Sequence, residues 1–155
     1  MKRQIIAVSL AGIIVLLDQL TKILVSWERP NFKVIPGFFN IHYVENTGAA
    51  FGILQDKRTL LTFVSVLAVG VLLFLIFSAR DEQKGMLAAL ALILAGTCGN
   101  LIDRVRLGYV IDFLQFHLKQ YYWPSFNIAD AAISVGVGIL IFVSLRQEAK
   151  SLLHT

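Results

Sequence analysis

Apolar and polar positions are distributed very unevenly along the chain, in a pattern that predicts a membrane protein. Four long apolar stretches alternate with short segments that hold most of the charges, and they cover residues 5–27, 59–79, 85–103 and 127–146. Each stretch is about 18 to 23 residues long, which is enough for a helix to cross a hydrocarbon core of roughly 30 Å. We therefore predict an all-α membrane protein, a four-transmembrane-helix bundle, in which residues 1–155 form a single integral membrane domain.

The first apolar stretch has a second interpretation, as a cleavable signal peptide. Lys2 and Arg3 precede it, as in a secretory leader. No small-x-small cleavage site follows, however, and apolar residues resume after the polar residues between Asp18 and Lys22. We expect an uncleaved transmembrane helix.

The two long connectors carry different patterns. Residues 28–58 contain Pro30, Pro36 and Gly37 and an alternating segment over 38–44, which is typical of short antiparallel β-strands joined by turns. Residues 104–126 contain an aromatic cluster at 121–123, and because Tyr and Trp favour the headgroup layer, we expect an outer surface segment. Residues 80–84 form only a short turn.

Basic residues indicate the orientation. With four crossings, both termini and the 80–84 turn share one side of the membrane, and the two long connectors share the other. Lys and Arg are denser around the termini and the turn, and Lys2 and Arg3 directly precede the first helix. We predict cytoplasmic termini and outer connectors.

Composition agrees with a membrane location and excludes several function classes. The chain is 57% hydrophobic and 15% charged, with a mean hydropathy of +0.72, whereas a soluble domain carries about 25% charged residues. The net charge of +4 reflects basic residues that flank helices, so we expect no nucleic-acid partner. The lone Cys98 and the three dispersed histidines lack the spacing of a metal site, and no glycine-rich phosphate loop is present. We expect no metal and no other cofactor.

Polar residues inside or beside the apolar stretches are the candidate functional residues, because charges near lipid are costly. Asp18 and Lys22 have i, i+4 spacing. They either neutralise each other within the first helix, or Asp18 faces the bundle and supports a polar loop. Asn46 and Gly48 lie among small residues, which is typical of an ordinary hairpin turn or of a loop that approaches a ligand closely.

Polar residues also mark the end of the third helix and the start of the fourth. Asn100 and Arg104 share a helix face, beside Asp103. They indicate either a helix end that reaches the headgroups or a scaffold for a polar site. Asn127 and Asp130 begin the fourth helix, where an N-cap and a first-turn acid are the structural interpretation.

Asp112 and Asp130 together point to hydrolysis. Asp112 stands alone among bulky apolar residues, and the predicted topology places both carboxylates on the same side of the membrane. Two carboxylates brought close in a partly desolvated place share a proton, so one can act as acid and the other as base. Such a pair activates water against a peptide carbonyl without a metal. A transporter whose polar pathway is lined by Asp18, Asp112 and Asp130, and a non-catalytic membrane scaffold, remain alternatives.

Five segments in this order closely resemble those of bacterial lipoprotein signal peptidase, also called signal peptidase II. They are Asp18-Gln-Leu-Thr-Lys22, Asn46-Thr-Gly-Ala-Ala-Phe51, Gly99-Asn-Leu-Ile-Asp-Arg104, Val110-Ile-Asp-Phe113 and Phe126-Asn-Ile-Ala-Asp130. Each motif is short, but five in order on a chain with this hydropathy profile are specific.

The resemblance implies an aspartic endopeptidase of the bacterial cytoplasmic (inner) membrane, with its active site at the outer face. It implies Asp112 and Asp130 as the catalytic pair. It implies substrate-binding and supporting roles for Asp18, Asn46, Gly48, Asn100, Arg104 and Asn127. The expected substrates are diacylglyceryl-modified prolipoproteins cleaved before the lipidated cysteine, and membrane lipid is a further partner. Cyclic peptide antibiotics such as globomycin are the expected inhibitors, and we expect a monomer.

The resemblance also implies two outer structural parts, a small antiparallel β-cradle and an adjacent surface helix. Residues 28–52 and 105–125 are expected to supply them.

Overall fold

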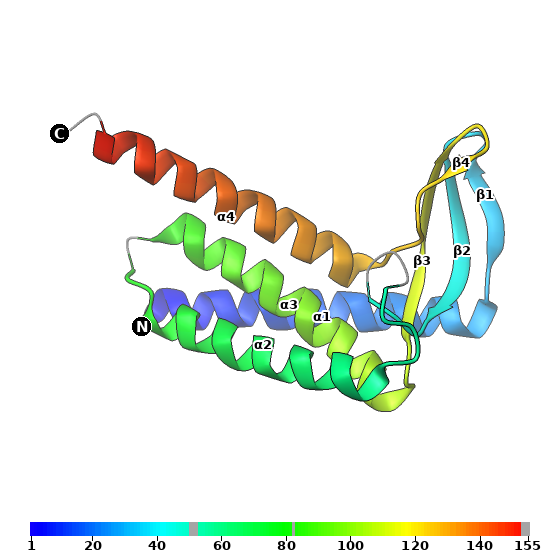
Figure 1. Ribbon diagram of the computed structural model, residues 1–155, viewed down its shortest axis with the longest axis horizontal. Coiled ribbons are helices and arrows are strands. Elements are labelled where there is room, and N and C mark those ends of the chain that lie inside the picture. The colour runs from blue at the N-terminus through cyan, green and yellow to red at the C-terminus, as the bar shows by residue number, and fades with distance from the viewer. Residues whose placement is uncertain (50–52, 82, 153–155) are drawn as a thin grey trace.

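A computed structural model of the chain describes residues 1–49, 53–81 and 83–152, and side chains up to residue 149. Residues 50–52, at the end of the predicted Asn46 turn segment, lie outside the described residues. Four helices run along the long axis of the molecule, and a small β-sheet stands at one end of them (Figure 1). We call this end of the bundle the sheet end.

The four predicted helices are present, and each is long and apolar enough to cross a membrane. They are α1 (Lys2–Glu28), α2 (Arg58–Ser78), α3 (Lys84–Arg106) and α4 (Ile128–Leu152). The start of α1, the end of α4 and the turn between α2 and α3 lie at the end opposite the sheet (Figure 1). The α-amino group of Met1 forms an ion pair with Asp81 of that turn at 3.2 Å. The start of α1 and the short turn are therefore held together at one end of the bundle.

Helix α3 is the centre of the bundle. Half of its apolar window is buried, against 17% for each of the other three helices. The core consists of Leu72 and Ile76 on α2, Ala7 and Ala11 on α1, and a run of Leu and Ala on α3. Because the outward faces of α1, α2 and α4 expose large apolar side chains, the bundle presents the surface expected against lipid.

Glycine allows α3 and α4 to approach closely, as the small residues in these stretches predict. A Cβ on Gly96 would overlap the carbonyl oxygen of Ala129, and one on Gly136 would lie 2.8 Å from the carbonyl oxygen of Ala89. This close packing places the start of α4 directly against the last turns of α3, where the polar residues cluster.

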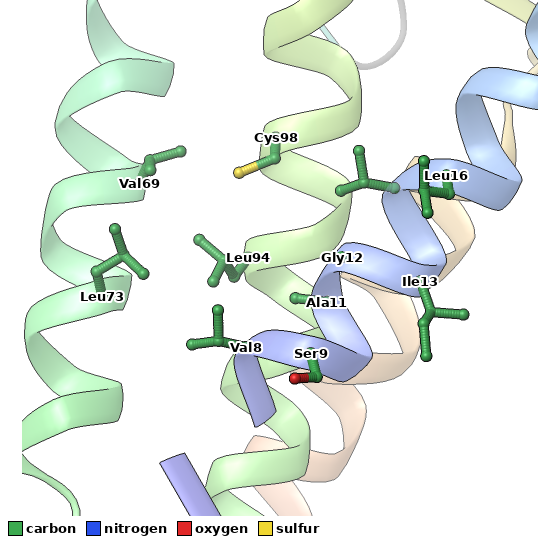
Figure 2. Close-up of a pocket in the computed structure, with 11 residues that line it drawn as sticks. Val8, Ser9, Ala11, Gly12, Ile13, Leu16, Val69, Leu73, Leu94 and Cys98 are labelled. Atoms are coloured by element: carbon green, nitrogen blue, oxygen red, sulfur yellow. The ribbon is translucent and has the colours of Figure 1, made fainter. Parts of the chain in front are cut away.

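An apolar pocket of about 670 Å³ lies farther from the sheet, between α1, α2 and α3. Figure 2 shows Val69 and Leu73 of α2 facing Val8 of α1 and Leu94 of α3. Cys98 also lines this pocket. Its lining carries no charged side chain among the described residues.

The sheet has four antiparallel strands in the order β1-β2-β3-β4. They are β1 (Asn31–Ile35), β2 (Phe39–Asn46), β3 (Val110–Leu118) and β4 (Tyr121–Tyr122). The first connector supplies β1 and β2 as predicted, and the second connector completes the sheet by pairing β3 with β2.

The prediction of a surface helix in residues 105–125 was wrong. After α3 ends at Arg106, residues 107–126 contain β3 and β4 and no helix. Two sets of backbone hydrogen bonds hold β3 extended: those to β2, and those between residues 113–114 and Phe126. The β-branched and aromatic residues of 110–116 also favour a strand.

Candidate active site

A pocket of about 990 Å³ opens at the sheet end, and both Asp112 and Asp130 line it. Its wall contains residues of β2 and β3, of the segment before α4, and of the three helices α2, α3 and α4. The polar lining residues include Asn46, Thr47, Ser65, Thr97, Asn100, Arg104, Asp112, Asp130 and Ser134. The pocket therefore extends from the sheet down into the membrane-spanning part of the bundle.

Asp112 lies on β3, opposite Val44 of β2. A register shift between Ile41 and Val44 precedes this pair, and such bulges re-aim side chains. The diagonal neighbour Asn46 donates its side-chain N–H to Asp112 Oδ2 at 2.9 Å. Asn127 donates to Asp112 Oδ1 at 2.7 Å.

Asp112 is only 2% exposed. Burial, followed by the nearby charge of Asp130, raises the pKa of Asp112 to about 7, although the hydrogen bonds from Asn46 and Asn127 oppose the shift. A group with this pKa can hold a proton or release it at neutral pH, which general acid–base catalysis requires.

Asp130 occupies the first turn of α4, and Asn127 is the N-cap of that helix. The backbone N–H of Asp130 donates to Asn127 Oδ1 at 2.9 Å, and the backbone N–H of Asn127 donates to Asp130 Oδ2 at 3.2 Å. This reciprocal pair is a capping box. The capping interpretation from the sequence is therefore correct, and it fixes the Asp130 carboxylate beside the pocket.

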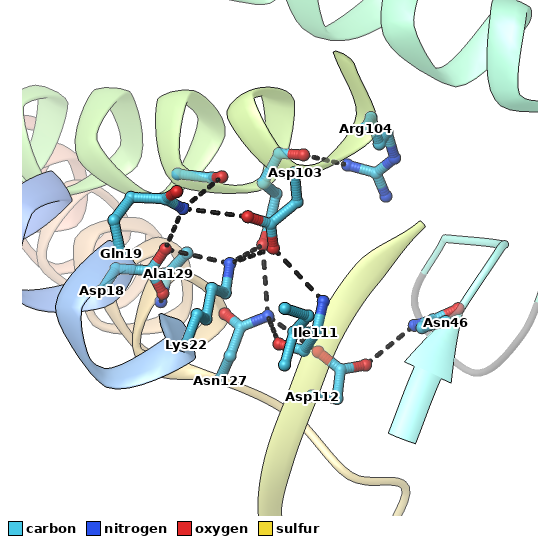
Figure 3. Close-up of polar contacts among 12 residues, drawn as sticks. Asp18, Gln19, Lys22, Asn46, Asp103, Arg104, Ile111, Asp112, Asn127 and Ala129 are labelled. Atoms are coloured by element: carbon cyan, nitrogen blue, oxygen red, sulfur yellow. Dashed lines mark hydrogen bonds and ion pairs between the residues drawn. The ribbon is translucent and has the colours of Figure 1, made fainter. Parts of the chain in front are cut away.

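Two buried amides connect the two carboxylates. Asn100 donates to Asp130 Oδ1 at 2.8 Å and accepts a hydrogen bond from Asn127 at 3.2 Å. Since Asn127 also donates to Asp112, a continuous path of hydrogen bonds runs from one carboxylate to the other. Figure 3 shows Asn127 between Asp112 and the polar cluster on α1 and α3.

Arg104 connects α3 to the turn after β2. Its guanidinium donates to the carbonyl oxygen of Gly48 at 3.0 Å, and the Gly48 N–H donates to Asn46 Oδ1 at 2.9 Å. Asn100 and Arg104 both line the pocket, as their shared helix face predicts. The structure thus brings Asn46, Gly48 and Arg104 together beside Asp112.

Asp18 fits both interpretations from the sequence. It forms a buried ion pair with Lys22 at 2.9 Å, and its second oxygen accepts the backbone N–H of Ala129 at 2.9 Å. Asp18 therefore contacts the backbone beside Asp130 and does not line the pocket. Lys22 also forms an ion pair with Asp103 at 2.8 Å across two helices, a contact that the sequence analysis did not predict. The signal available in the sequence was that a charged side chain inside an apolar stretch is costly unless it has a partner.

The arrangement also bears on the transporter alternative. Asp112 and Asp130 lie at the same end of the bundle, and Asp18 is 0% exposed and points into a packed contact with α4. The three carboxylates thus gather at the sheet end and do not follow one another across the membrane. A scaffold that only packs helices would need no pocket lined by two carboxylates.

The fold and the pocket define a multi-pass membrane protein with a polar site at one end of a four-helix bundle. Residues 10–146 match the family model described as signal peptidase (SPase) II, and the chain belongs to this family. It is therefore a peptidase, and the resemblance recognised in the sequence is confirmed.

Relatives and solved structures agree with this assignment. The lipoprotein signal peptidase of Syntrophus aciditrophicus is 45% identical, with 89% of this chain and 91% of that protein covered. The lipoprotein signal peptidase of Geobacter sulfurreducens is 49% identical, with 86% and 88% covered. A solved bacterial membrane enzyme superposes with a TM-score of 0.86 at 33% identity, covering 93% of this chain and 90% of that one.

Proposed function

We propose that the protein removes the signal peptide from diacylglyceryl-modified prolipoproteins, by hydrolysing the peptide bond immediately before the lipidated cysteine. Water activated between Asp112 and Asp130 is the nucleophile. The observation that carries this proposal is that the two carboxylates line one pocket and are joined by the amides of Asn100 and Asn127. Membership of the signal peptidase II family supports the same reaction.

The pair works with a single shared proton. The ionised carboxylate removes a proton from water, the resulting hydroxide attacks the scissile carbonyl carbon, and the protonated carboxyl donates its proton to the carbonyl oxygen. The tetrahedral intermediate then collapses: one of its hydroxyl protons returns to the carboxylate that had donated, the C–N bond breaks, and the departing amine takes up the proton that the other carboxyl removed from water. The products are a signal peptide with a new carboxylate and a lipoprotein whose cysteine has a free amino group. The two carboxyls titrate as a unit, so acid and base are assigned to the pair.

The shape of the pocket suits a substrate embedded in lipid. Its wall includes Val64 and Ala68 of α2 and Ile133 and Val135 of α4, which lie inside membrane-spanning helices. A signal-peptide helix and acyl chains would contact these apolar side chains, while the scissile bond meets the carboxylates near the surface.

The proposed location agrees with this geometry. We place the enzyme in the bacterial cytoplasmic membrane with cytoplasmic termini, so that the sheet end faces outward, where the diacylglyceryl group of the substrate resides. The protein acts as a monomer in this proposal, since one chain supplies both carboxylates. Globomycin-type cyclic peptides are the proposed inhibitors and would compete for the same pocket.

The test compares two precursors of one sequence in detergent, one carrying the diacylglyceryl group on its cysteine and one with the free thiol. We expect cleavage before the cysteine of the lipidated precursor at least about 10²-fold faster in kcat/KM, because the acyl chains contribute binding energy inside the pocket. Mass spectrometry of both products locates the cut bond. A purified, folded protein that leaves the lipidated precursor intact would refute the proposed function.

Arg104→Ala should raise KM for the lipidated precursor by about 10-fold, with a smaller change in kcat. The guanidinium positions the Gly48 turn at the pocket, and its loss removes a charged hydrogen bond that contributes roughly 1.5 to 3 kcal/mol. Steady-state kinetics on detergent-solubilised protein measure both constants. Arg106→Ala, two residues on, is the matched control, because Arg106 is exposed and does not line the pocket. A lower yield of folded protein with unchanged KM would contradict this role in substrate binding and would mean that Arg104 has a structural role only.

A further inference from the structure

We propose that Lys22 is a positioning residue for the catalytic pair. It is the centre of a buried ion triad, Asp18–Lys22–Asp103, that holds the two backbone segments carrying Asp112 and Asp130 at a fixed separation. The inference rests on the proposed function, since it concerns the alignment of these two carboxylates.

The triad is fully removed from solvent. Lys22 is 1% exposed, Asp18 0% and Asp103 2%. The Lys22 ammonium lies 2.9 Å from Asp18 Oδ2 and 2.8 Å from Asp103 Oδ2, and it donates to Asn100 Oδ1 at 3.0 Å. These contacts use all three of its N–H donors. Because a buried charge is costly unless its geometry is fully satisfied, this complete set of partners defines one position for each carboxylate.

Each carboxylate of the triad then holds the residue immediately before a catalytic aspartate. Asp18 Oδ1 accepts the backbone N–H of Ala129 at 2.9 Å, and Ala129 precedes Asp130. Asp103 Oδ2 accepts the backbone N–H of Ile111 at 3.2 Å, and Ile111 precedes Asp112. The ammonium of Lys22 thus connects the first turn of α4 to the start of β3, and Figure 3 shows it between Asp18 and Asp103.

The third contact of Lys22, to Asn100, helps to orient the Asn100 amide together with Asn127. Because Asn100 Oδ1 faces the ammonium, Asn100 Nδ2 points to Asp130 Oδ1 at 2.8 Å. Without the ammonium, only the longer, uncharged hydrogen bond from Asn127 at 3.2 Å would hold the Asn100 oxygen away from the Asp130 carboxylate. Lys22 therefore acts on Asp130 by way of the Asn100 side chain. It also acts on both Asp112 and Asp130 by way of the backbone.

Gln19 shows that the triad is organised by more than charge neutralisation. Its amide donates to Asp18 Oδ2 at 3.2 Å and to Asp103 Oδ1 at 2.9 Å, so a second group bridges the same two carboxylates. A simple intrahelical pair would need only Asp18 and Lys22. The bridge to Asp103 on α3 is what connects the two catalytic segments.

The experiment measures kcat, KM and thermal unfolding for Lys22→Met, Asp103→Asn and Asp103→Ala. We expect Lys22→Met to lower kcat by about 10²-fold while KM changes less than about 3-fold, because a displacement of about 1 Å at a reacting centre has this effect on rate. Asp103→Asn keeps an oxygen for the Ile111 N–H and should lose only about 10-fold. Asp103→Ala loses that oxygen and should lose about 10²-fold, so the conservative variant partly rescues activity.

Matched controls lie at the opposite end of the bundle. Lys84→Met removes an exposed lysine at the start of α3, and Asp81→Asn removes the ion pair with the amino terminus. Both should keep kcat within about 2-fold of wild type, since surface ion pairs contribute little.

Two results would overturn the inference. The first is a Lys22→Met protein that folds and keeps the wild-type kcat. The second is an Asp103→Ala protein whose kcat per folded molecule equals that of Asp103→Asn, and this comparison decides the matter if Lys22→Met does not fold. Failure of the proposed function looks different, because the wild-type protein itself would then leave the lipidated precursor uncleaved.

Discussion

Asp112→Asn and Asp130→Asn should each lower kcat for the lipidated precursor by about 10³-fold or more. An amide has nearly the size of a carboxyl but neither accepts a proton from water nor donates one to the scissile carbonyl at neutral pH. General acid–base groups contribute about 10² to 10⁴-fold each, and members of one catalytic unit are not additive, so the double variant should be little worse than either single variant.

The structure defines the controls for this experiment. Each oxygen of the two carboxylates accepts a hydrogen bond from an N–H group. An asparagine amide at position 112 or 130 would therefore place its own NH₂ group against one of these N–H donors. Thermal unfolding and binding of the uncleaved precursor must therefore be measured alongside turnover. Asp56→Asn, at an exposed aspartate in the segment before α2, should keep wild-type kinetics. Wild-type turnover in either Asp112→Asn or Asp130→Asn would refute the two-aspartate mechanism.

The helices were predictable because lipid imposes a strict rule on sequence. About 20 consecutive apolar residues are needed to cross a membrane, and the four stretches can be recognised from their composition alone. The same rule exposed the candidate site, since Asp112, Asp130 and Asp18 are costly where they stand. Local chemistry sufficed for the Asn127 cap, which lies three residues before the acid that it holds.

Pairings between distant segments were not predictable from local pattern. Residues 110–116 of β3 pair with residues 39–46 of β2, which lie far away in the sequence, so the pairing depends on how the helices place the two connectors side by side. The aromatic cluster at 121–123 indicated a membrane surface and was compatible with helix or strand. The β-branched and aromatic residues of 110–116 favoured a strand locally, but they did not show which strand would be its partner. The bridge between Lys22 and Asp103 depends on the packing of α1 against α3 and is equally nonlocal.

The site combines residues that each have a structural reason to be present. Asn127 and Asp130 form the two halves of the capping box that begins α4. Asp18 accepts a backbone N–H of the first turn of the same helix. Structural and catalytic interpretations of these residues are therefore compatible. The same hydrogen bonds that start α4 also prevent the Asp130 carboxylate from turning away from the pocket. Rigid positioning of this kind is what acid–base catalysis demands.

Raising the pH from 5 to 8 should destabilise the wild-type protein more than Asp112→Asn, by on the order of 3 kcal/mol. The pKa of Asp112 is about 7 in the folded protein, chiefly because of burial, and near 3.9 in an unfolded chain. Between these two values the folded state binds the proton that the unfolded state has already released. The favourable contribution of Asp112 is thus complete below about pH 4 and is lost as the pH rises through 7. Asparagine at this position does not titrate, so its contribution is the same at both pH values.

Thermal unfolding in a mild detergent at pH 5, 6, 7 and 8 provides the measurement, because the comparison uses the change with pH and not the absolute stability. A constant offset from the altered hydrogen bonds of Asp112→Asn cancels in this difference. For a chain of this size, 3 kcal/mol corresponds to a relative shift in Tm of roughly 6 to 12 °C. Asp56→Asn should follow the wild-type slope, since that aspartate is exposed. Parallel pH dependences for wild type and Asp112→Asn would mean that Asp112 ionises at an ordinary pKa, and burial in the pocket would then not be what readies this carboxyl for proton transfer at neutral pH.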